Sequence, residues 1–167
     1  MQTIVSGKRS SVFFNPKNNT YLKIFSPKFS SKIKFFFKFR KYPGENFFYI
    51  STRLNKLNIK TVEILNFTKY SVTTNRLEGD ILFDYLNKFP ENKEIIYRYI
   101  ELVSKVLNNN LYYGDFNLFN FIVKENELYA LDLEDYKPYI FSNKKEAIRR
   151  LYSKVDSWII DEIIKKL

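Results

Sequence analysis

Hydrophobic and polar residues alternate along the first quarter of the chain with the two-residue period of β-strands. Three such stretches cover residues 3–5, 11–14 and 20–25. The first turn falls at Gly7, and the sequence NPKNN at 15–19 is a strong signal for the second. The pattern therefore predicts a small antiparallel meander.

The period then changes to that of a helix. Apolar residues recur three and four positions apart over 43–57, which predicts a helix that opens with Pro and Gly. Two further strands are expected at 61–65 and 70–74. The sequence RLEG at 76–79 has the polar, glycine-containing character of a linker.

Helical spacing dominates the rest of the chain. The expected helices cover 81–87, 92–108, 143–153 and 155–166. The inner side of the 92–108 helix is expected to carry Ile95, Ile96, Tyr99, Ile100, Val103 and Val106. Two short strands, 119–123 and 128–131, are expected between them, joined by the polar turn KENE. Phe119, Phe121 and Val123 are expected to anchor the first of these strands in the core. The element order predicts an α+β protein with a β-rich lobe over 1–75, a hinge at 76–79 and a helical lobe over 80–167.

The charge is unevenly distributed between the two halves. The 167 residues carry a net charge of +10, and residues 1–80 hold 15 Lys and Arg against 4 Asp and Glu. A basic half of this kind indicates a polyanionic partner, such as nucleotide phosphates, nucleic acid or anionic lipid.

Two residue types are missing and limit the chemistry. The chain contains neither Cys nor His, which excludes disulfides, thiolate metal sites and catalytic units built on histidine. Acid–base catalysis must then use Asp, Glu, Lys or Tyr, and a metal must be a hard cation held by oxygen.

The first residues lack the apolar core of a secretory signal, and no stretch is apolar enough to span a bilayer. We therefore expect a cytoplasmic protein.

Asp115 interrupts an otherwise apolar and aromatic run, LYYGDFNLFNFIV at 111–123. A carboxylate in such surroundings is costly unless it is paired, hydrogen-bonded or bound to a cation. Taken alone, Asp115 could be a turn residue. The functional alternative is that it accepts a proton from a hydroxyl group.

The predicted hairpin at 119–131 brings further polar residues to the same place. Asn120 opens its first strand and Asp132 follows its second, so antiparallel pairing should bring the two close together. Amide and carboxylate oxygens suit Mg²⁺, although Asn120 could equally make a hydrogen bond at the strand start. Glu134 and Asp135 compete with Asp132, and the first acid after the strand is the better ligand.

These motifs resemble the catalytic and metal-binding segment of protein-kinase-like phosphotransferases: GD, an asparagine five residues later, a short hairpin, then an apolar strand and Asp. Within that superfamily the chain is most similar to the bacterial lipopolysaccharide core heptose kinases. The similarity covers about residues 4–137 and is carried by PGEN at 43–46, LNIKTVEIL at 57–65, RLEGD at 76–80 and ALDLEDYK at 130–137.

The resemblance implies a compact two-lobed protein-kinase-like fold, with a sheet and one helix in the first lobe and a reduced helical second lobe. It implies ATP and Mg²⁺ as cofactors, Asp115 as the catalytic residue, and Asn120 and Asp132 as metal ligands. Lys23 in YLKIF corresponds to the lysine that holds the nucleotide phosphates, and Glu45 corresponds to its helix partner.

Further nucleotide contacts are implied by position. Backbone groups near Asn75 and Leu77 correspond to the hinge that meets adenine, and Gly7 in GKRSS lies in the corresponding phosphate loop.

Two features depart from the family pattern. Tyr113 stands where the family has His, and the phosphate loop has one glycine.

The activity implied is transfer of the γ-phosphate of ATP to a sugar hydroxyl of the lipopolysaccharide core, most closely a heptose. Two alternatives stay open. One is a kinase for another acceptor, such as a protein or a small alcohol, and the other is a pseudokinase that binds nucleotide without catalysis. The partners expected are ATP and a lipid-linked or sugar acceptor, and no nucleic acid.

The stretch KFSSKIKFFFKFRK at 28–41 mixes cations with phenylalanines. One interpretation is a loop and a solvated helix face over core phenylalanines. A second is a patch that touches an anionic membrane surface, at the inner face of the inner membrane. Binding to nucleic acid is a third, although no nucleic-acid-binding motif accompanies the stretch.

Overall fold

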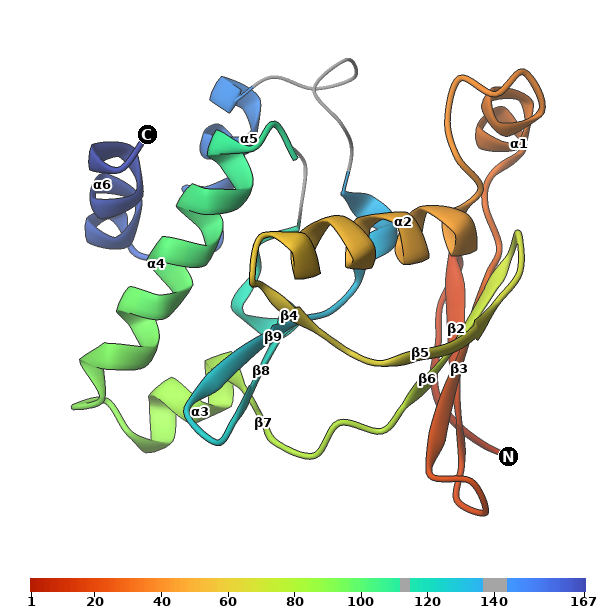
Figure 1. The fold of residues 1–167 in the computed structure, drawn as a ribbon, viewed down its shortest axis with the longest axis horizontal. Helices are drawn as coiled ribbons and strands as arrows, with labels where there is room; N and C mark the ends of the chain where they lie inside the picture. Colours follow the sequence, from red (N-terminus) through yellow and green to blue (C-terminus); the bar gives the residue numbers. More distant parts are fainter. Residues whose placement is uncertain (112–114, 137–143) are drawn as a thin grey trace. The chain divides into compact units, whose positions relative to one another are not determined.

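The computed structural model of the 167-residue chain describes residues 1–111, 115–136 and 144–167 (Figure 1). It contains an antiparallel sheet near the N-terminus and helices in the C-terminal half, which confirms the predicted α+β class. Among the described residues, no helix combines the length and the apolar character that crossing a bilayer requires.

The chain forms two compact units. The first consists of Met1–Thr52 and Val62–Leu77, and the second consists of Arg53–Thr61 and Glu78–Leu167. The long helix that follows residue 42 therefore begins in the first unit and ends in the second. Sequence patterns had assigned all of residues 1–75 to one lobe.

The first unit is built on a five-stranded antiparallel sheet with the order β1-β2-β3-β6-β5. Its strands are β1 (Gln2–Ser6), β2 (Ser10–Asn15), β3 (Thr20–Phe25), β5 (Ile64–Phe67) and β6 (Ser71–Asn75). The predicted meander is confirmed, and its first turn is closed by a 2.9 Å hydrogen bond from the Gly7 amide to the Ser10 carbonyl.

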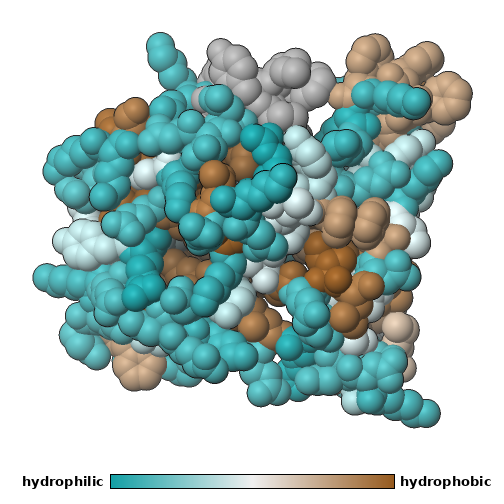
Figure 2. All heavy atoms as spheres, in the orientation of Figure 1, coloured by the Kyte–Doolittle hydropathy of each residue, from teal (hydrophilic) through white to brown (hydrophobic). Residues whose placement is uncertain are grey.

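Two helices accompany this sheet, α1 (Phe29–Phe36) and α2 (Pro43–Lys56). Helix α1 lies within the stretch 28–41, for which one of the interpretations was a loop and a solvated helix face over core phenylalanines. Hydrophobic residues gather on the molecular surface over it, at the upper right of Figure 2.

Gly44 explains why α2 begins with Pro and Gly. Its amide donates to the Lys69 carbonyl at 3.1 Å, so the first turn of α2 lies directly against the β5–β6 hairpin. A Cβ atom at this position would stand 2.1 Å from the Thr68 oxygen and 2.6 Å from the Ser71 oxygen. Glycine is therefore required by the close approach of two backbones.

The expected strand at 61–65 is two strands that belong to different sheets. β4 (Lys60–Thr61) pairs in parallel with β9, whereas β5 pairs with β6. Ile59 and Val62, which flank β4, are both buried. One short predicted strand therefore conceals a change of sheet.

The second unit contains a four-stranded sheet with the order β4-β9-β8-β7 and the remaining helices. The strands added here are β7 (Asp80–Ile81), β8 (Phe121–Lys124) and β9 (Glu127–Ala130). The helices are α3 (Leu82–Lys88), α4 (Lys93–Asn108), α5 (Lys144–Leu151) and α6 (Ser157–Lys165), with short 3₁₀ turns η1 (Leu118–Asn120) and η2 (Leu133–Asp135).

Helix α4 is the centre of this unit. The side that sequence periodicity assigned to the interior is buried along its whole length, and its residues are Ile95, Ile96, Tyr99, Ile100, Val103 and Val106. Helix α6 packs on α4 and buries Ile159, Ile160 and Ile163. Each fully buried isoleucine contributes about 1.5–3 kcal/mol to folding, so the apolar side of α6 stabilises the second unit.

Candidate active site

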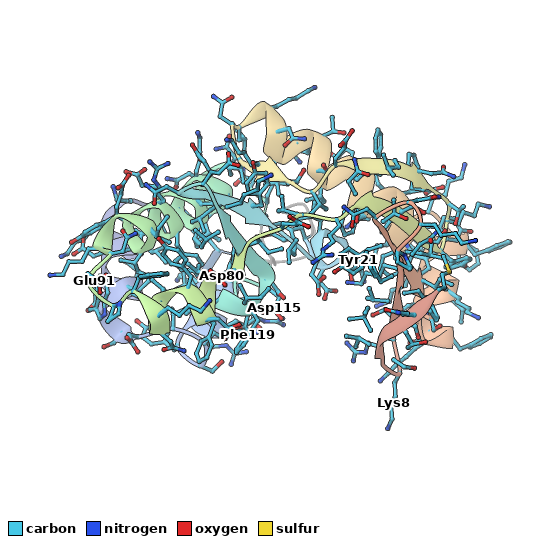
Figure 3. All side chains as sticks on the ribbon, turned by 90° about the horizontal axis from the view of Figure 1, so that it is seen from below. Lys8, Tyr21, Asp80, Glu91, Asp115 and Phe119 are labelled. Carbon is cyan, nitrogen blue, oxygen red and sulfur yellow. The ribbon has the colours of Figure 1, made fainter. Side chains whose placement is uncertain are left out.

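Asp115 lies in the segment that leads into the β8–β9 hairpin, at the same end of the second unit as Phe119 (Figure 3). Its side chain is 38% exposed, and the next residue, Phe116, is buried. The side-chain nitrogen Nδ2 of Asn120 donates to the backbone carbonyl of Asp115 at 2.8 Å. Tyr113, which replaces the family histidine, lies outside the described residues.

The backbone between Asp115 and the hairpin forms a 3₁₀ turn rather than a strand. Asn117 caps η1, because its side-chain oxygen accepts from the Phe119 amide at 3.3 Å. Strand β8 therefore begins at Phe121, two residues later than predicted. Phe119, expected to anchor the strand in the core, is instead 51% exposed and stacks on Phe83 with ring centroids 4.5 Å apart.

The hairpin brings Asn120 and Asp132 to the same end, as its predicted pairing required. Phe121 pairs with Ala130, and one step further the Leu131 amide donates to the Asn120 carbonyl at 2.8 Å. Asp132 follows Leu131 directly in the chain.

Asp132 itself has a left-handed backbone, with φ 51° and ψ 45°. Aspartate tolerates this region better than most residues. The turn sends Leu133 into the core, where it is fully buried, and leaves Asp132 exposed. Of the two competing acids, Glu134 is half-buried within η2 and Asp135 is exposed.

Two buried tyrosines lie beneath these carboxylates. The hydroxyl of Tyr99 donates to the carbonyl of Phe116 at 2.5 Å, and the ring of Tyr136 packs edge-on against the ring of Phe116 at 5.8 Å. Both tyrosines are at most 1% exposed. They fix the backbone directly after Asp115.

Burial raises the pKa of both hydroxyl groups above the ordinary value of 10.0. For Tyr136 the carboxylates of Asp115 and then Asp132 add to the increase in pKa; for Tyr99 the additional contributions come from Tyr136 and then Asp115.

Lys154 contributes a cation that no sequence motif predicted. Its ammonium group donates to Oδ1 of Asp115 across 39 residues of sequence. The turn after α5 holds Lys154 in place, because its amide donates to the Leu151 carbonyl at 2.8 Å. The Lys154 side chain is 27% exposed, so the ion pair is half-buried rather than on the open surface.

Lys154 also lines a groove of about 710 Å³ in the second unit. Residues of α3, α4 and α6 line this groove together with Leu118 of η1. Three partly exposed aromatic side chains and two amides face it: Phe83, Tyr97, Trp158, Asn87 and Asn92. Aromatic faces beside hydrogen-bonding groups suit a small polar ligand with apolar ring faces.

The predicted nucleotide residues belong to the first unit. Lys23 is half-buried in the middle of β3, between Val12 of β2 and Val72 of β6. Its ammonium nitrogen lies 5.7 Å from the centroid of the Phe25 ring. Glu45 is half-buried in the first turn of α2. The ion pair between Lys23 and Glu45 stays a prediction.

The remaining nucleotide residues are also placed. Gly7 is exposed in the β1–β2 turn, and its neighbour Lys8 projects from the tip of that turn (Figure 3). Asn75 ends β6; its amide donates to the Glu63 carbonyl at 3.0 Å and its side chain to the Glu63 carboxylate at 2.5 Å. Leu77 is the last residue of the first unit. Contacts of these residues with nucleotide stay predictions.

Asn120 and Asp132 present the kind of donors that Mg²⁺ prefers. Because the Asn120 nitrogen is used by the Asp115 carbonyl, its oxygen is the atom left for a ligand, and Asp132 adds an exposed carboxylate. Within the described ranges, no group of three or more His, Cys, Asp or Glu side chains forms a metal cluster. The two residues therefore fit a metal whose other ligands come from phosphate and water.

Comparisons with known proteins identify the fold. No protein-family model and no curated protein matches the chain. Among solved structures it is similar to the ternary complex of APH(2")-IIa, an aminoglycoside phosphotransferase, with streptomycin and ATP. The two share a TM-score of 0.64 and 11% sequence identity, over 99% of this chain and 75% of that one. At this identity the similarity shows the fold alone, so the predicted protein-kinase-like fold is confirmed.

Proposed function

We propose that this chain is an ATP-dependent phosphotransferase that transfers the γ-phosphate of ATP to an alcohol group of a sugar. One observation carries the proposal. The side chain of Asn120 holds the backbone of Asp115 at 2.8 Å, and the hairpin register brings Asp132 to the same end. In a protein-kinase-like fold these three residues supply a base and two metal ligands.

In the proposed reaction Asp115 orients the acceptor hydroxyl and takes its proton. The hydroxyl oxygen forms a bond to the γ-phosphorus while the bond from that phosphorus to the bridging oxygen breaks, so ADP leaves. Most of the catalysis comes from positioning and charge neutralisation rather than from covalent chemistry. The hydrogen bonds of the Asn120 side chain and the Tyr99 hydroxyl hold two successive backbone carbonyls, those of Asp115 and Phe116.

Asn120 and Asp132 are the residues that would hold Mg²⁺ with the nucleotide. When bound, the metal neutralises charge on the phosphate oxygens. Lys23, supported by Glu45, is proposed to hold the α- and β-phosphates. Gly7 and the backbone near Asn75 and Leu77 are the proposed contacts for phosphate and adenine.

Lys154 is proposed to position Asp115. An ammonium group on Oδ1 fixes the rotation of the carboxylate and leaves Oδ2 for the acceptor hydroxyl. Because Lys154 also lines the aromatic groove, an acceptor held there would lie beside the base. Partly exposed rings of Tyr97 and Trp158 suit the apolar faces of a sugar.

The acceptor we favour is a heptose of the lipopolysaccharide core, because the short motifs at 43–46, 57–65, 76–80 and 130–137 resemble those of the core heptose kinases. A lipid-linked acceptor would bring the chain to the cytoplasmic face of a membrane. A second candidate is an aminoglycoside-like small alcohol, favoured by the fold it shares with an aminoglycoside phosphotransferase. A protein acceptor and an inactive pseudokinase are the remaining alternatives.

Transfer of labelled γ-phosphate from ATP tests the proposal. The purified chain is incubated with Mg²⁺ and extracted lipopolysaccharide core, with the same core lacking its heptoses, and with a set of aminoglycosides. We expect label on the complete core and none on the heptose-free core. Label on an aminoglycoside alone would show that the acceptor is an aminoglycoside-like alcohol and not a heptose. ATP binding without phosphate transfer to any acceptor or to water would indicate a pseudokinase.

A further inference from the structure

Helix α1 and the turn after it expose an unusual amount of aromatic surface. Five large apolar side chains in this segment are 45–77% exposed: Phe29, Ile33, Phe36, Phe37 and Phe39. Single exposed apolar residues are ordinary on protein surfaces, whereas a contiguous group marks a site of interaction. The first unit therefore has a surface whose function the proposed phosphoryl transfer does not explain.

The exposed residues share one side of the helix. Phe29, Ile33 and Phe36 follow one another at intervals of four and three residues, so they form a single stripe along α1. Phe35 points elsewhere. It is 3% exposed, and its ring packs against Tyr42 with centroids 5.4 Å apart. Helix α1 is thus anchored through Phe35 and turns a separate apolar face outward.

Cations surround this face. Residues 28–41 contain six Lys and Arg and no Asp or Glu. Two of the six lie near aromatic rings, Arg40 at 5.9 Å from the ring centroid of Phe35 and Lys41 at 4.7 Å from that of Tyr49. The other four are exposed, and they are Lys28, Lys32, Lys34 and Lys38.

We propose that this face of α1 docks on an anionic lipid surface, with the phenylalanines entering the headgroup boundary and the lysines meeting anionic headgroups. The partner must combine an apolar interior with negative charge, which a bilayer supplies along one plane. Single-stranded nucleic acid is bound in a groove between stacking platforms, whereas these rings project from one convex helix. The inference does not depend on phosphotransferase activity.

Sedimentation of the full chain with lipid vesicles tests this. We expect binding to vesicles of one part phosphatidylglycerol to two parts phosphatidylcholine, weak binding to phosphatidylcholine alone, and loss of binding as salt is raised. Equal binding to both vesicle types, or to neither, would overturn the proposal.

Two pairs of variants assign the binding to α1. The double variant Phe36→Ser/Phe37→Ser should bind anionic vesicles at least tenfold more weakly, whereas Phe89→Ser, at an exposed phenylalanine of the second unit, should bind like the parent. Lys32→Glu/Lys34→Glu should lose affinity by roughly fivefold or more per lysine, and Lys17→Glu, in the exposed β2–β3 turn, should not.

The substituted residues are exposed, so unchanged circular dichroism and melting temperature are expected for each variant. Full vesicle binding by Phe36→Ser/Phe37→Ser would overturn the proposal. A second outcome would also overturn the proposal. In it the parent protein binds a single-stranded oligonucleotide tightly but does not bind vesicles, and Phe36→Ser/Phe37→Ser abolishes the oligonucleotide binding.

Discussion

The ammonium group of Lys154 donates a hydrogen bond to the carboxylate of Asp115, joining the turn after α5 to the segment before β8. Both side chains are partly buried. Lys154 also faces the groove that the aromatic residues of α3, α4 and α6 line. The ion pair therefore holds the Asp115 carboxylate beside a lysine that lines the groove.

Lys154→Met keeps the length of the side chain and removes the charge. We expect kcat for ATP turnover to fall about tenfold, since the carboxylate loses its fixed orientation, while KM for ATP stays unchanged because Lys154 has no proposed role in nucleotide binding. Steady-state kinetics with the substrate that supports turnover measure both.

Matched variants separate positioning from fold or groove damage. Lys154→Arg should recover most of kcat. Lys93→Met should behave like the parent, since Lys93 lines the same groove but pairs with no carboxylate in the part of the chain that the structure describes. Equal losses in Lys154→Met and Lys93→Met would mean that the groove, and not the ion pair, matters.

Asn120→Ala removes both the hydrogen bond to the Asp115 carbonyl and an oxygen proposed to bind the metal. We expect the Mg²⁺ concentration for half-maximal turnover to rise at least tenfold, together with a lower kcat. Asn117→Ala is the control, because Asn117 caps η1 and should alter stability without altering the Mg²⁺ requirement. An unchanged Mg²⁺ requirement in Asn120→Ala would remove Asn120 from the metal site.

Tyr99→Phe leaves the buried Phe116 carbonyl without its donor. The free energy of unfolding should fall by about 1–3 kcal/mol, the usual cost of an unsatisfied buried polar group. Tyr97→Phe, at a 48% exposed position on the same helix, should change it by less than about 0.5 kcal/mol. Denaturant unfolding of both variants gives the comparison, and equal effects would contradict the role assigned to Tyr99.

The buried tyrosines also predict how stability changes at alkaline pH. The pKa of Tyr136 is raised in the folded protein, above all by burial, so the unfolded chain releases this proton first. Stability from this group is complete below about pH 10 and is lost as the pH rises further. Tyr136→Phe should reduce the alkaline slope of the unfolding free energy by up to about 1.4 kcal/mol per pH unit. If Tyr136→Phe left the pH dependence of the unfolding free energy unchanged, the pKa of Tyr136 would not be raised by burial in the folded protein.

Sequence patterns predicted the helices and strands well where local hydrophobic periodicity alone determines them. The three-stranded meander, the start of α2 at Pro43 and the buried side of α4 all follow from local periodicity. The strand at 61–65 was wrong because its two halves pair with partners from different parts of the chain. Local hydrophobicity cannot distinguish those partners.

The candidate site was predictable as far as it is local. Asp115, Asn120 and Asp132 lie within 18 residues of one another, and hairpin pairing brings two of them together. Lys154 was not predictable, because nothing in its neighbourhood distinguishes it from the other lysines and its partner lies 39 residues away. Phe119 was wrongly placed in the core, because the cap at Asn117 turns the backbone before β8 starts.

The most direct test of the central claim is the initial rate of phosphate transfer from Mg-ATP by Asp115→Asn relative to the parent. The substitution keeps the size of the side chain and removes its ability to take a proton. We expect the rate to fall by roughly 10²–10⁴-fold, with ATP binding unchanged in the same preparation. A variant that transfers phosphate at the parent rate would contradict the assignment of Asp115 as the base.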